Sequence, residues 1–514
     1  MLPLGTIESP EIVIGLVGRI GLDTRLVSEK IKSVLSTYSY ETKILKVTSL
    51  LPKLKALPTI IDHPLEEYYK TRIAACNKLR EISERNDILA CLAIIRIREL
   101  RGEKGDRDSP LKRVAYIVDQ IKRPEETELL RQVYRDFFIQ VSCHAPRDVR
   151  ERILAHKISN SHPENSREEN WRATAAQLIG RDDAEEEEKA GQRVREAFPL
   201  ADVIVNASAE AILGNELGRF FEIFFGHPTR SPTLDEYGIA LAFNASVRSI
   251  DMSQQVGAAI VSPIGETLAL GCNEVPKAGG GTYWEGDTGD ARDAALGEDQ
   301  NTRRKRLMVT DVVYRLAKAK LAPEKFTKFR VEDLEAELID APEAPLKDCL
   351  VLDSLEFGRM MHAEMCAITE AARIGIPVRK AILYCTTFPC HNCAKHIVGV
   401  GIDKVVYLKP YPKSHVSELY PDSIEIDSAS ASQRKIAFRQ FVGLAPARYY
   451  LFSKDRLKDD TGKIKKWERS TANPVSRQVI PQQSDVEKFA LDTFQSALEK
   501  IRSTEVNQVT PGGS

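Results

Sequence analysis

Three side chains with metal-binding chemistry stand in two short stretches of the sequence. The stretch MHAEMC contains His362, and the stretch FPCHNC contains Cys390 and Cys393. One imidazole and two thiolates form a common set of three protein ligands for Zn²⁺, with the fourth position open for water. Glu364 stands two residues after His362, so we expect its carboxylate to reach that water without binding the metal.

This pattern, H-x-E followed by P-C-x-x-C, is typical of zinc nucleobase deaminases. Zn²⁺ lowers the pKa of a bound water from about 15.7 to near 7, which makes a nucleophile available at neutral pH. Glu364 would then carry a proton to the ring nitrogen and later to the departing ammonia. The alternative is a structural zinc site, which usually has four protein ligands. Its fourth ligand would be Cys385, Cys366 or His391. Because Glu364 and Pro389 both occupy signature positions, we expect a catalytic site.

Composition and charge favour a globular protein of two domains. At 514 residues the chain exceeds the size of one hydrophobic core. It has 73 Lys and Arg against 74 Asp and Glu, and this balance argues against an extensive surface for nucleic acid. Nine cysteines without a regular framework suit a reducing cytoplasm. A signal-peptide pattern and an apolar run of about 18 residues are both absent from the sequence. We therefore expect a soluble, cytoplasmic protein without a membrane span.

The first half of the chain reads as alternating strands and helices. A buried strand at Ile12–Val17 leads through a glycine turn into a helix, and this alternation then repeats. Such an order indicates an α/β domain with a parallel sheet covered by helices. The further strands are expected at 114–118, 138–141 and 201–205, and the helices at 23–35, 88–101, 125–137 and 209–225.

The second half is expected to place the metal ligands at the starts of two helices. After a linker at 227–232, a helix and a hairpin come first, and a polar insertion of about residues 280–350 follows. His362 then begins a helix, a strand follows, and Cys390 begins the next helix. The expected elements are helices at 237–248 and 362–373, strands at 256–261, 268–272, 381–384 and 404–408, and a final helix at 485–501.

This second half resembles the deoxycytidylate deaminases of the zinc cytidine-deaminase superfamily. The stretches that carry the resemblance are RSIDMSQQVGAAIVSPIGE (248–266), GCNEVPKAGG (271–280), HAEMCAI (362–368), LYCTTFPCHNCAKHIVGVGIDKVVYLKPYPKS (383–414) and FVGLAPARYY (441–450). The resemblance implies the cytidine-deaminase fold, an α/β/α domain with a mixed sheet and both zinc helices on one face. It also implies Zn²⁺ as cofactor and a homo-oligomer.

The resemblance also implies roles for individual residues. Those that correspond to the family's zinc ligands and proton shuttle are His362, Cys390, Cys393 and Glu364. Asn273 stands in the position of the G-[YW]-N motif, where it would contact the sugar hydroxyl and the base, although Cys272 replaces the aromatic residue. Alternatively, Asn273 shapes the turn before Pro276. The backbone at Ala363 would hydrogen-bond the pyrimidine edge, and Lys413 would contact the substrate.

The first half resembles the P-loop kinase-like domain that is fused to such deaminases in bacterial anti-phage dCTP deaminases. The stretches that carry this resemblance are EIVIGLVGRIGLDTRLVSEKI (11–31), RVAYIVDQIKRPEE (113–126), QVYRDFFIQVSCHAPRDVR (132–150) and FPLADVIVNAS (198–208). We therefore expect a three-layer, degenerate P-loop kinase-like domain at 1–228, a deaminase domain at 232–455 and a C-terminal extension at 456–514.

The glycine turn of the first half departs from the phosphate-loop pattern G-x-x-x-x-G-K-[ST], whose Lys reaches the terminal phosphates. The turn GRIGLDT contains Gly18 and Gly21 but lacks this Lys. Asp23 would repel a phosphate there. We therefore do not expect kinase turnover. Gly18, Gly21 and Thr24 are candidates for binding a nucleotide effector, and the alternative is a purely structural turn.

For the whole chain, the resemblance implies deamination of free deoxycytidine nucleotides, dCTP and also dCMP, which would deplete dCTP in defence against phage. The candidate phosphate contacts are Lys277, Arg292, Arg303, Arg304, Lys305 and Lys413. Two alternatives stay open: a polynucleotide cytidine or adenosine deaminase with its basic cluster at 303–306, and a catalytically silent nucleotide sensor. An inhibitory small RNA is a further partner that the resemblance implies.

Overall fold

The computed structural model describes residues 8–162, 167–184, 190–347, 349–411, 414–428, 434–453, 457–476, 483–495, 497 and 499–501. The chain divides into two compact units. Unit 1 comprises Met1–Glu236 and Phe441–Ser514, and unit 2 comprises Tyr237–Gln440. The expected domain limits near 228 and 455 stay predictions, while the compact units divide at Glu236 and Gln440.

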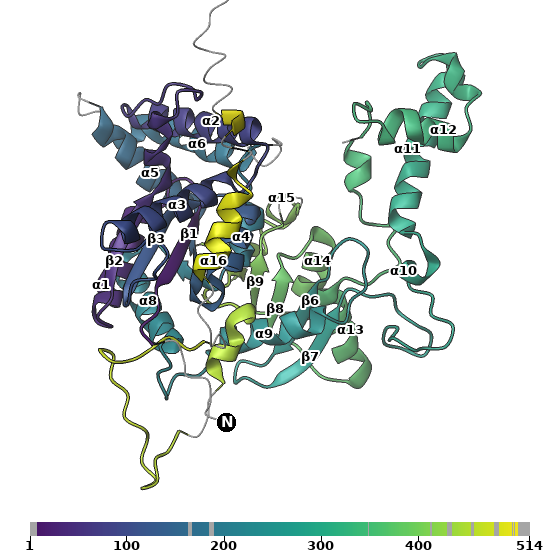
Figure 1. The fold of residues 1–514 in the computed structure, drawn as a ribbon. Coiled ribbons are helices and arrows are strands. Elements are labelled where there is room, and N and C mark those ends of the chain that lie inside the picture. The colour runs from purple at the N-terminus through teal and green to yellow at the C-terminus, as the bar shows by residue number, and fades with distance from the viewer. Residues whose placement is uncertain are drawn as a thin grey trace, which may run out of the picture. The chain divides into compact units, whose positions relative to one another are not determined.

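Unit 1 is built on a six-stranded sheet with the order β12-β5-β4-β1-β3-β2 (Figure 1). Every neighbouring pair is parallel except β12 with β5. All seven residues of β1 are buried, as expected of a central strand covered on both faces. The strands are β1 (Ile12–Gly18), β2 (Glu41–Lys46), β3 (Val114–Ile121), β4 (Phe138–His144), β5 (Val203–Asn206) and β12 (Gly443–Leu444).

Helices cover both faces of this sheet. On one face, α1 and α8 share an apolar core with alternate residues of β1, among them Ile12, Ile14 and Leu16. On the other face, α3 lies near β3. Arg101 of α3 and Tyr116 of β3 both donate hydrogen bonds to the carboxylate of Glu11. The helices are α1 (Thr24–Ser36), α2 (Leu65–Ser83), α3 (Ile88–Gly102), α4 (Pro124–Tyr134), α5 (Arg147–Ser161), α6 (Arg172–Ala184), α7 (Val194–Ala197), α8 (Glu210–Phe224) and α16 (Gln483–Asp492).

The expected parallel strands and most expected helices of unit 1 are present, with three notable differences. Strand β2 and helices α2, α5 and α6 were not expected from the pattern. Helix α16 ends at Asp492, and after a turn at 493 and 494 the described residues among 495–501 are helical again, so the expected final helix is interrupted. The segment after Gln440 joins unit 1 because Gly443 and Leu444 pair with β5.

Unit 2 is built on a second six-stranded sheet with the order β10-β11-β9-β8-β6-β7. Strands β6 and β7 form an antiparallel hairpin, and β6 is antiparallel to β8. The remaining neighbours are parallel, so the sheet is mixed as expected. The strands are β6 (Gly257–Val261), β7 (Thr267–Cys272), β8 (Ile382–Thr387), β9 (Lys404–Lys409), β10 (Ile424–Ile426) and β11 (Ile436–Gln440).

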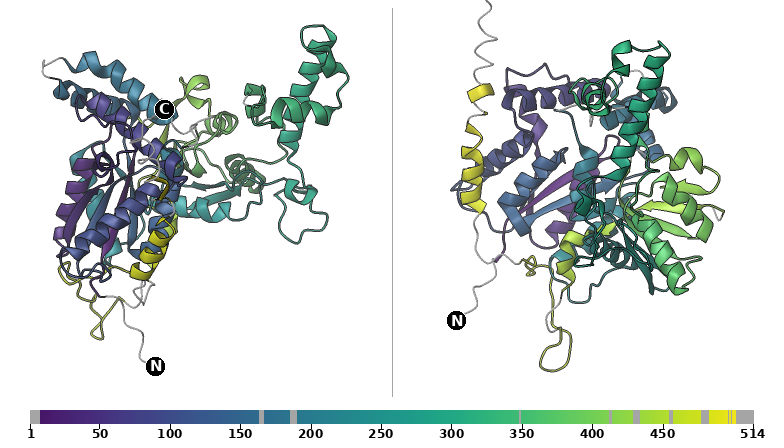
Figure 2. Two further views of the ribbon diagram at one scale, coloured as in Figure 1. Left: turned by 45° about the horizontal axis from the view of Figure 1, so that its top comes forward. Right: turned by 90° about the vertical axis from the view of Figure 1, so that its right-hand side faces the viewer.

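Two layers of helices enclose the sheet of unit 2. Helices α13 and α14 share an apolar core with Ala258, Leu383 and Val405 on one face. Helix α9 packs on the opposite face, where Gly238 lies directly against the ring of Tyr384. The insertion forms a separate helical group (Figure 2) with a small apolar core of its own. The helices are α9 (Leu234–Ser246), α10 (Asp293–Leu296), α11 (Gln300–Lys318), α12 (Val331–Glu335), α13 (Ala363–Ile374), α14 (His391–Val400) and α15 (Val416–Leu419).

Within the ranges that the structure describes, we find no helix that combines the length and the apolar character needed to cross a membrane.

Candidate metal centre

The metal-binding side chains stand at the starts of two helices of unit 2. His362 is the N-cap residue of α13, and Cys390 is the N-cap residue of α14. Cys393 lies in the first turn of α14 and is fully buried. Because the N-terminus of a helix carries partial positive charge, it stabilises a thiolate placed there.

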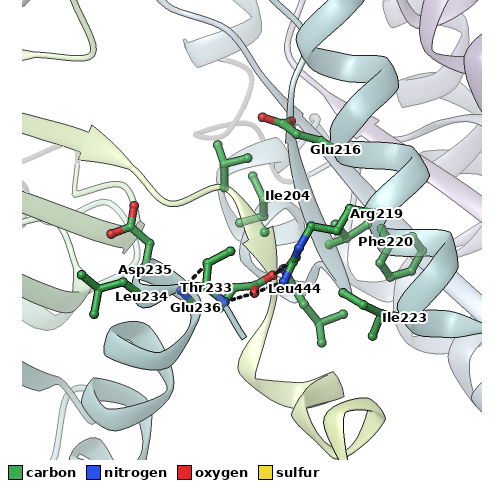
Figure 3. A pocket seen from close by; sticks show the side chains of 13 residues that line it. Ile204, Glu216, Arg219, Phe220, Ile223, Thr233, Leu234, Asp235, Glu236 and Leu444 are labelled. Atoms are coloured by element: carbon green, nitrogen blue, oxygen red, sulfur yellow. Dashed lines mark hydrogen bonds and ion pairs between the residues drawn. The ribbon is translucent and has the colours of Figure 1, made fainter. Parts of the chain in front are cut away.

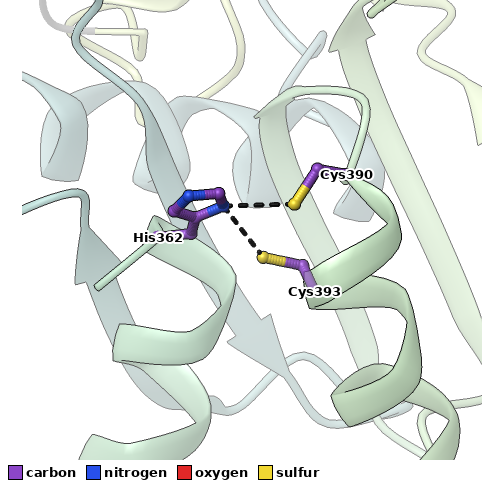
Figure 4. A group of neighbouring side chains, drawn as sticks. All are labelled: His362, Cys390 and Cys393. Carbon is purple, nitrogen blue, oxygen red and sulfur yellow. Dashed lines mark hydrogen bonds between the residues drawn. The ribbon is translucent and has the colours of Figure 1, made fainter. Parts of the chain in front are cut away.

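The three side chains converge on one point (Figure 4). The Nδ1 atom of His362 lies 3.2 Å from Sγ of Cys390 and 3.4 Å from Sγ of Cys393. All three donor atoms lie within 4.8 Å of one another. A tetrahedral zinc ion with bonds of about 2.0 to 2.3 Å separates its ligand atoms by about 3.6 Å. The donor set therefore fits Zn²⁺ in both chemistry and spacing.

Hydrogen bonding sets the protonation of this group. The hydrogen bond with Cys393, together with the one with His362, lowers the pKa of Cys390 to about 4. The hydrogen bond to Cys390 raises the pKa of His362 to about 9, against the effect of burial. Cys390 is thus a thiolate at neutral pH, which is the form that binds a metal.

Glu364 lies beside the metal ligands without belonging to them. Its side chain is buried, and its Oε2 atom accepts a hydrogen bond from Sγ of Cys393 at 3.4 Å. Burial is the main cause that raises the pKa of this carboxyl. A carboxyl in such surroundings exchanges protons more readily at neutral pH than an exposed one.

The hairpin of unit 2 positions α13 through close backbone contact. A Cβ atom on Gly271 of β7 would lie 2.2 Å from the carbonyl oxygen of Ala363. Only glycine therefore allows β7 and the first turn of α13 to approach so closely. Beyond β7, Glu274 and Met361 exchange two backbone hydrogen bonds, of 3.2 and 3.1 Å. These bonds fix the residue that directly precedes His362.

The three other candidate substrate contacts are Asn273, Ala363 and Lys413, and their surroundings differ. Asn273 is buried, and its amide group bonds the backbone: Oδ1 accepts from Val256 N and Nδ2 donates to Gln254 O, both at 2.7 Å. In this state Asn273 shapes the preceding loop. Ala363 is the first residue of α13 and is fully buried beside the ligands. Lys413 lies outside the described residues.

Most of the candidate phosphate contacts already have partners within unit 2. Lys277 bonds Asp287 at 2.6 Å, and Arg303 pairs with Glu298 at 3.3 Å. Lys305 donates to the carbonyl of Leu352 at 2.6 Å. The other two candidates in the described ranges are Arg292, paired with Asp290, and the exposed Arg304. These contacts indicate that the cations chiefly hold the insertion together.

His391 lies beside the metal ligands, and the sequence suggested it only as a fourth ligand of a structural zinc site. His391 directly follows Cys390, and its Nε2 atom lies 3.9 Å from Glu356. Its Nδ1 atom is buried and has no hydrogen-bond partner among the described residues. The segment that follows the insertion therefore lies next to the metal ligands. The sequence signal for this contact is weak because Glu356 stands 35 positions before His391, with α13 and β8 between them.

The candidate nucleotide-binding residues belong to unit 1. Gly18 ends β1, Gly21 has a φ of 94°, and Thr24 begins α1. The three residues therefore form one strand–turn–helix connection, as the sequence predicts.

Unit 1 also contains a cavity of about 440 Å³ that no motif in the sequence indicates (Figure 3). Its walls come from β5, α8, β12 and the segment Thr233–Glu236. Arg219 and Glu236 both line the cavity, and Arg219 donates two hydrogen bonds of 2.7 Å to the carboxylate of Glu236. Glu216 lines the same cavity, and burial raises its pKa to about 7.

Comparison with known proteins places the metal centre in a recognised class. Residues 232–409, about a third of the chain, match the family described as the cytidine and deoxycytidylate deaminase zinc-binding region. Because the matched region is a zinc-binding one and the His362, Cys390 and Cys393 group fits the ion, zinc is the cofactor of this site. Neither the P-loop assignment of unit 1 nor the anti-phage family is tested by this match.

Individual relatives share shorter stretches. ComE operon protein 2 of Bacillus subtilis is 40% identical over 67 residues, which are 13% of this chain and 34% of that protein. The deoxycytidylate deaminase of Enterobacteria phage T4 is 46% identical over 54 residues, 10% of this chain and 28% of that enzyme. The chain therefore spans about a third of the length of these relatives. A crystal structure of the dCMP deaminase of cyanophage S-TIM5 with dCMP and dUMP is 17% identical, with a TM-score of 0.23, over 41% of this chain and 100% of that chain.

Proposed function

We propose that unit 2 is a zinc-dependent deaminase that converts free deoxycytidine nucleotides to deoxyuridine nucleotides. The observation that carries the proposal is the place of Glu364. Its buried carboxylate lies 3.4 Å from Sγ of Cys393. It is not one of the three side chains that supply the metal-binding atoms. A structural zinc site needs four ligands and no such carboxylate.

In the proposed mechanism, each residue near the metal has a distinct task. His362, Cys390 and Cys393 hold the zinc ion. When bound, zinc activates water for attack on C4 of the cytosine ring. Glu364 takes up a proton and delivers it to N3 of the ring, and then transfers a second proton to the amino group. The C4–N bond breaks, ammonia leaves, and the C4 carbonyl of uracil remains.

The charge of the chain favours a free nucleotide over a polynucleotide as substrate. The formal net charge is -1, whereas proteins that bind strands usually present a basic surface. The basic cluster 303–306 would be the footprint of an editor, but Arg303 and Arg306 pair with acidic residues of the insertion. The names of phage relatives as deoxycytidylate deaminases also support a deoxynucleotide.

A finer part of the proposal concerns the substrate and its biological purpose. We propose that dCTP is deaminated as well as dCMP, and that the loss of dCTP limits phage DNA synthesis. The support is the resemblance of the whole chain to anti-phage dCTP deaminases. The purified zinc-loaded protein should therefore release uracil nucleotides from dCTP and dCMP, and leave single-stranded DNA unchanged. Activity on the strand alone would instead support an editor.

Substitution of Glu364 by Ala tests the catalytic assignment. We expect the variant to retain one zinc ion per chain and to lose activity on dCTP and dCMP by about 10² to 10⁴-fold, the usual contribution of general acid–base catalysis. Zinc content by atomic absorption and product release by chromatography are the two measurements. Glu370→Ala in the same helix is the matched control, because Glu370 pairs with Arg373 two turns away from the ligands.

The same variant separates the enzyme from a silent sensor. If the proposal is correct, Glu364→Ala abolishes protection of a bacterial host in a phage plaque assay, and Glu370→Ala preserves it. Full protection by the Glu364→Ala variant would show that the biological effect does not need deamination.

A further inference from the structure

The turn between β1 and α1 in unit 1 is enclosed by other parts of that unit. Gly21 has a φ of 94°, in the left-handed region that favours glycine. A Cβ atom on Gly21 would lie 2.7 Å from the carbonyl oxygen of Arg150 in α5. Arg150 also donates from its guanidinium to the carbonyl of Ile20 at 3.1 Å. Helix α5 is therefore in direct contact with the turn.

A carboxylate lies on the backbone of this turn. The Oδ2 atom of Asp182, from α6, accepts a hydrogen bond from the N–H of Ile20 at 2.8 Å. Asp182 is only 2% exposed. Its Oδ1 atom has no hydrogen-bond donor within the described parts of the chain. Backbone N–H groups at a glycine turn before a helix are the groups that bind phosphate in many α/β proteins.

A lysine from outside the turn accompanies this carboxylate. Nζ of Lys122, just after β3, donates to the carbonyl of Gly18 at 2.8 Å. The same Nζ atom lies 3.7 Å from Oδ1 of Asp182. Lys122 thus supplies a positive charge at the turn, although the turn's own sequence contains no lysine. Asp182 neutralises that charge internally.

The N-terminus of α1 has a second pair of the same kind. Asp23 caps the helix, since its Oδ1 atom accepts from the N–H of Leu26 at 3.3 Å. Lys157 of α5 lies 3.2 Å from the same oxygen. A phosphate bound at this connection would need the turn N–H groups, the helix N-terminus and a cation. The N–H of Ile20, the N–H of Leu26 and the two lysines already have carboxylate partners.

We propose that the turn Gly18–Gly21 is an anion-binding site whose anion is supplied by the chain itself, and that the carboxylate of Asp182 keeps phosphate-bearing small molecules out of it. The missing lysine of the turn is then replaced by Lys122. The negative charge of Asp182 and that of a phosphate would repel each other strongly at this short distance in a buried site. A phosphate therefore enters only after Asp182 leaves. This inference does not depend on the deaminase activity proposed for unit 2.

The test measures binding of inorganic pyrophosphate to the full-length chain by isothermal titration calorimetry. We expect no saturable binding to the wild-type protein. Asp182→Ser removes the charge and leaves room beside Ile20, so it should bind pyrophosphate at least about tenfold more tightly than wild type. The double variant with Lys122→Met should lose this gain, because the cation is then absent.

The matched control is another buried carboxylate that accepts a backbone hydrogen bond in unit 1. Asp202 is 1% exposed, accepts from Gln140 N at 2.7 Å and pairs with Arg448 at 2.9 Å. Asp202→Ser should lose stability without gaining affinity for pyrophosphate.

Three results would overturn the inference. The first is saturable pyrophosphate binding by the wild-type protein that Lys122→Met weakens. The second is a folded Asp182→Ser variant that binds no better than Asp202→Ser. The third concerns a replacement variant, which is needed only if circular dichroism shows that Asp182→Ser does not fold. Asp182→Asn, which keeps the shape and removes the charge, then takes its place, and its failure to gain affinity rejects the inference equally.

Discussion

At the scale of single residues, the metal centre is organised by the charges that its neighbours impose. Cys390 has a pKa of about 4 because Cys393 and His362 hydrogen-bond to its sulfur. Cys366 stands one turn after His362 and is equally buried, yet burial raises its pKa. Cys390 and Cys366 are thus both buried but differ in chemistry. In the other ligand, Cys393, the hydrogen bond with Cys390 raises the pKa of the thiol, so Cys390 is the sulfur of the pair that is ionised first.

Substitution of these two cysteines should separate metal binding from packing. We expect Cys390→Ala to lose zinc and to lower the melting temperature, because the site's binding energy also contributes to folding. Cys366→Ala should retain zinc and change stability by only about 1 kcal/mol, the usual cost of a small cavity. Zinc content by atomic absorption and melting by calorimetry check both statements. A zinc-replete Cys390→Ala variant would remove this residue from the ligand set.

Glu216 in the cavity of unit 1 should make stability depend on pH. Burial raises its pKa from 4.5 to about 7, against the hydrogen bond from Asn206 N. Between these values the folded state keeps a proton that the unfolded state has released. The free energy of unfolding therefore falls as pH rises from 4.5 to about 7, and this contribution is constant above that range. Glu216→Gln should flatten the dependence in urea titrations at several pH values.

The control for this pH dependence is Glu210→Gln in the same helix. Glu210 is exposed and pairs with Lys30, so its replacement should leave the slope of stability against pH unchanged. An identical slope in wild type and Glu216→Gln would contradict the assignment.

At the scale of elements, the site depends on how closely β7 approaches α13. Gly271→Ala would place a methyl group 2.2 Å from the carbonyl oxygen of Ala363, so the helix that begins after His362 must shift. We expect a loss of about 1 to 3 kcal/mol in stability, together with weaker zinc retention against a chelator. Urea unfolding and the rate of zinc release to a chromophoric chelator measure the two effects.

Gly399→Ala is the corresponding control in helix α14. A Cβ atom there would meet nothing within 4 Å, and alanine favours a helix over glycine by up to about 1 kcal/mol. This variant should be as stable as wild type or more stable. If Gly271→Ala behaved like Gly399→Ala, the close approach of β7 would not constrain the metal centre.

The elements that carry the site could be predicted from sequence because their signals are local. His362 and Cys390 each precede an apolar helical pattern, and each is an N-cap residue in the structure. Strand β2 was missed because its sequence ETKILK leaves mostly half-buried or exposed positions at the edge of the sheet. The role of Asn273 could not be decided either, since its amide bonds two backbone groups 17 and 19 residues away.

At the scale of the whole molecule, contacts between distant parts of the sequence escape prediction altogether. Ile20 and Asp182 are 162 residues apart, and Arg101 and Glu487 are 386 apart. Neither pair has a motif, because the chemistry of each appears only when the fold brings the charges together. The missing lysine of the glycine turn was visible from the sequence. Its replacement by Lys122 was not.

The buried ion cluster that attaches α16 to unit 1 allows a prediction about global stability. Arg101 binds both Glu11 and Glu487, and the side chains of all three are fully buried. Glu487→Ala would leave the guanidinium with one carboxylate in a fully buried site, at a cost of about 3 kcal/mol or more. Urea unfolding followed by the fluorescence of Trp171 and Trp467 should therefore shift to lower urea concentration.

Lys488→Ala provides the control at the next position of the same helix. Lys488 is 46% exposed and pairs with Asp108 at 2.9 Å, and such surface pairs contribute about 0 to 1 kcal/mol. Its variant should unfold close to wild type, and the separation between the two curves measures the buried cluster alone. Overlapping curves for Glu487→Ala and Lys488→Ala would mean that α16 is not held by its charges, and that its other contacts with α3 and α4 suffice.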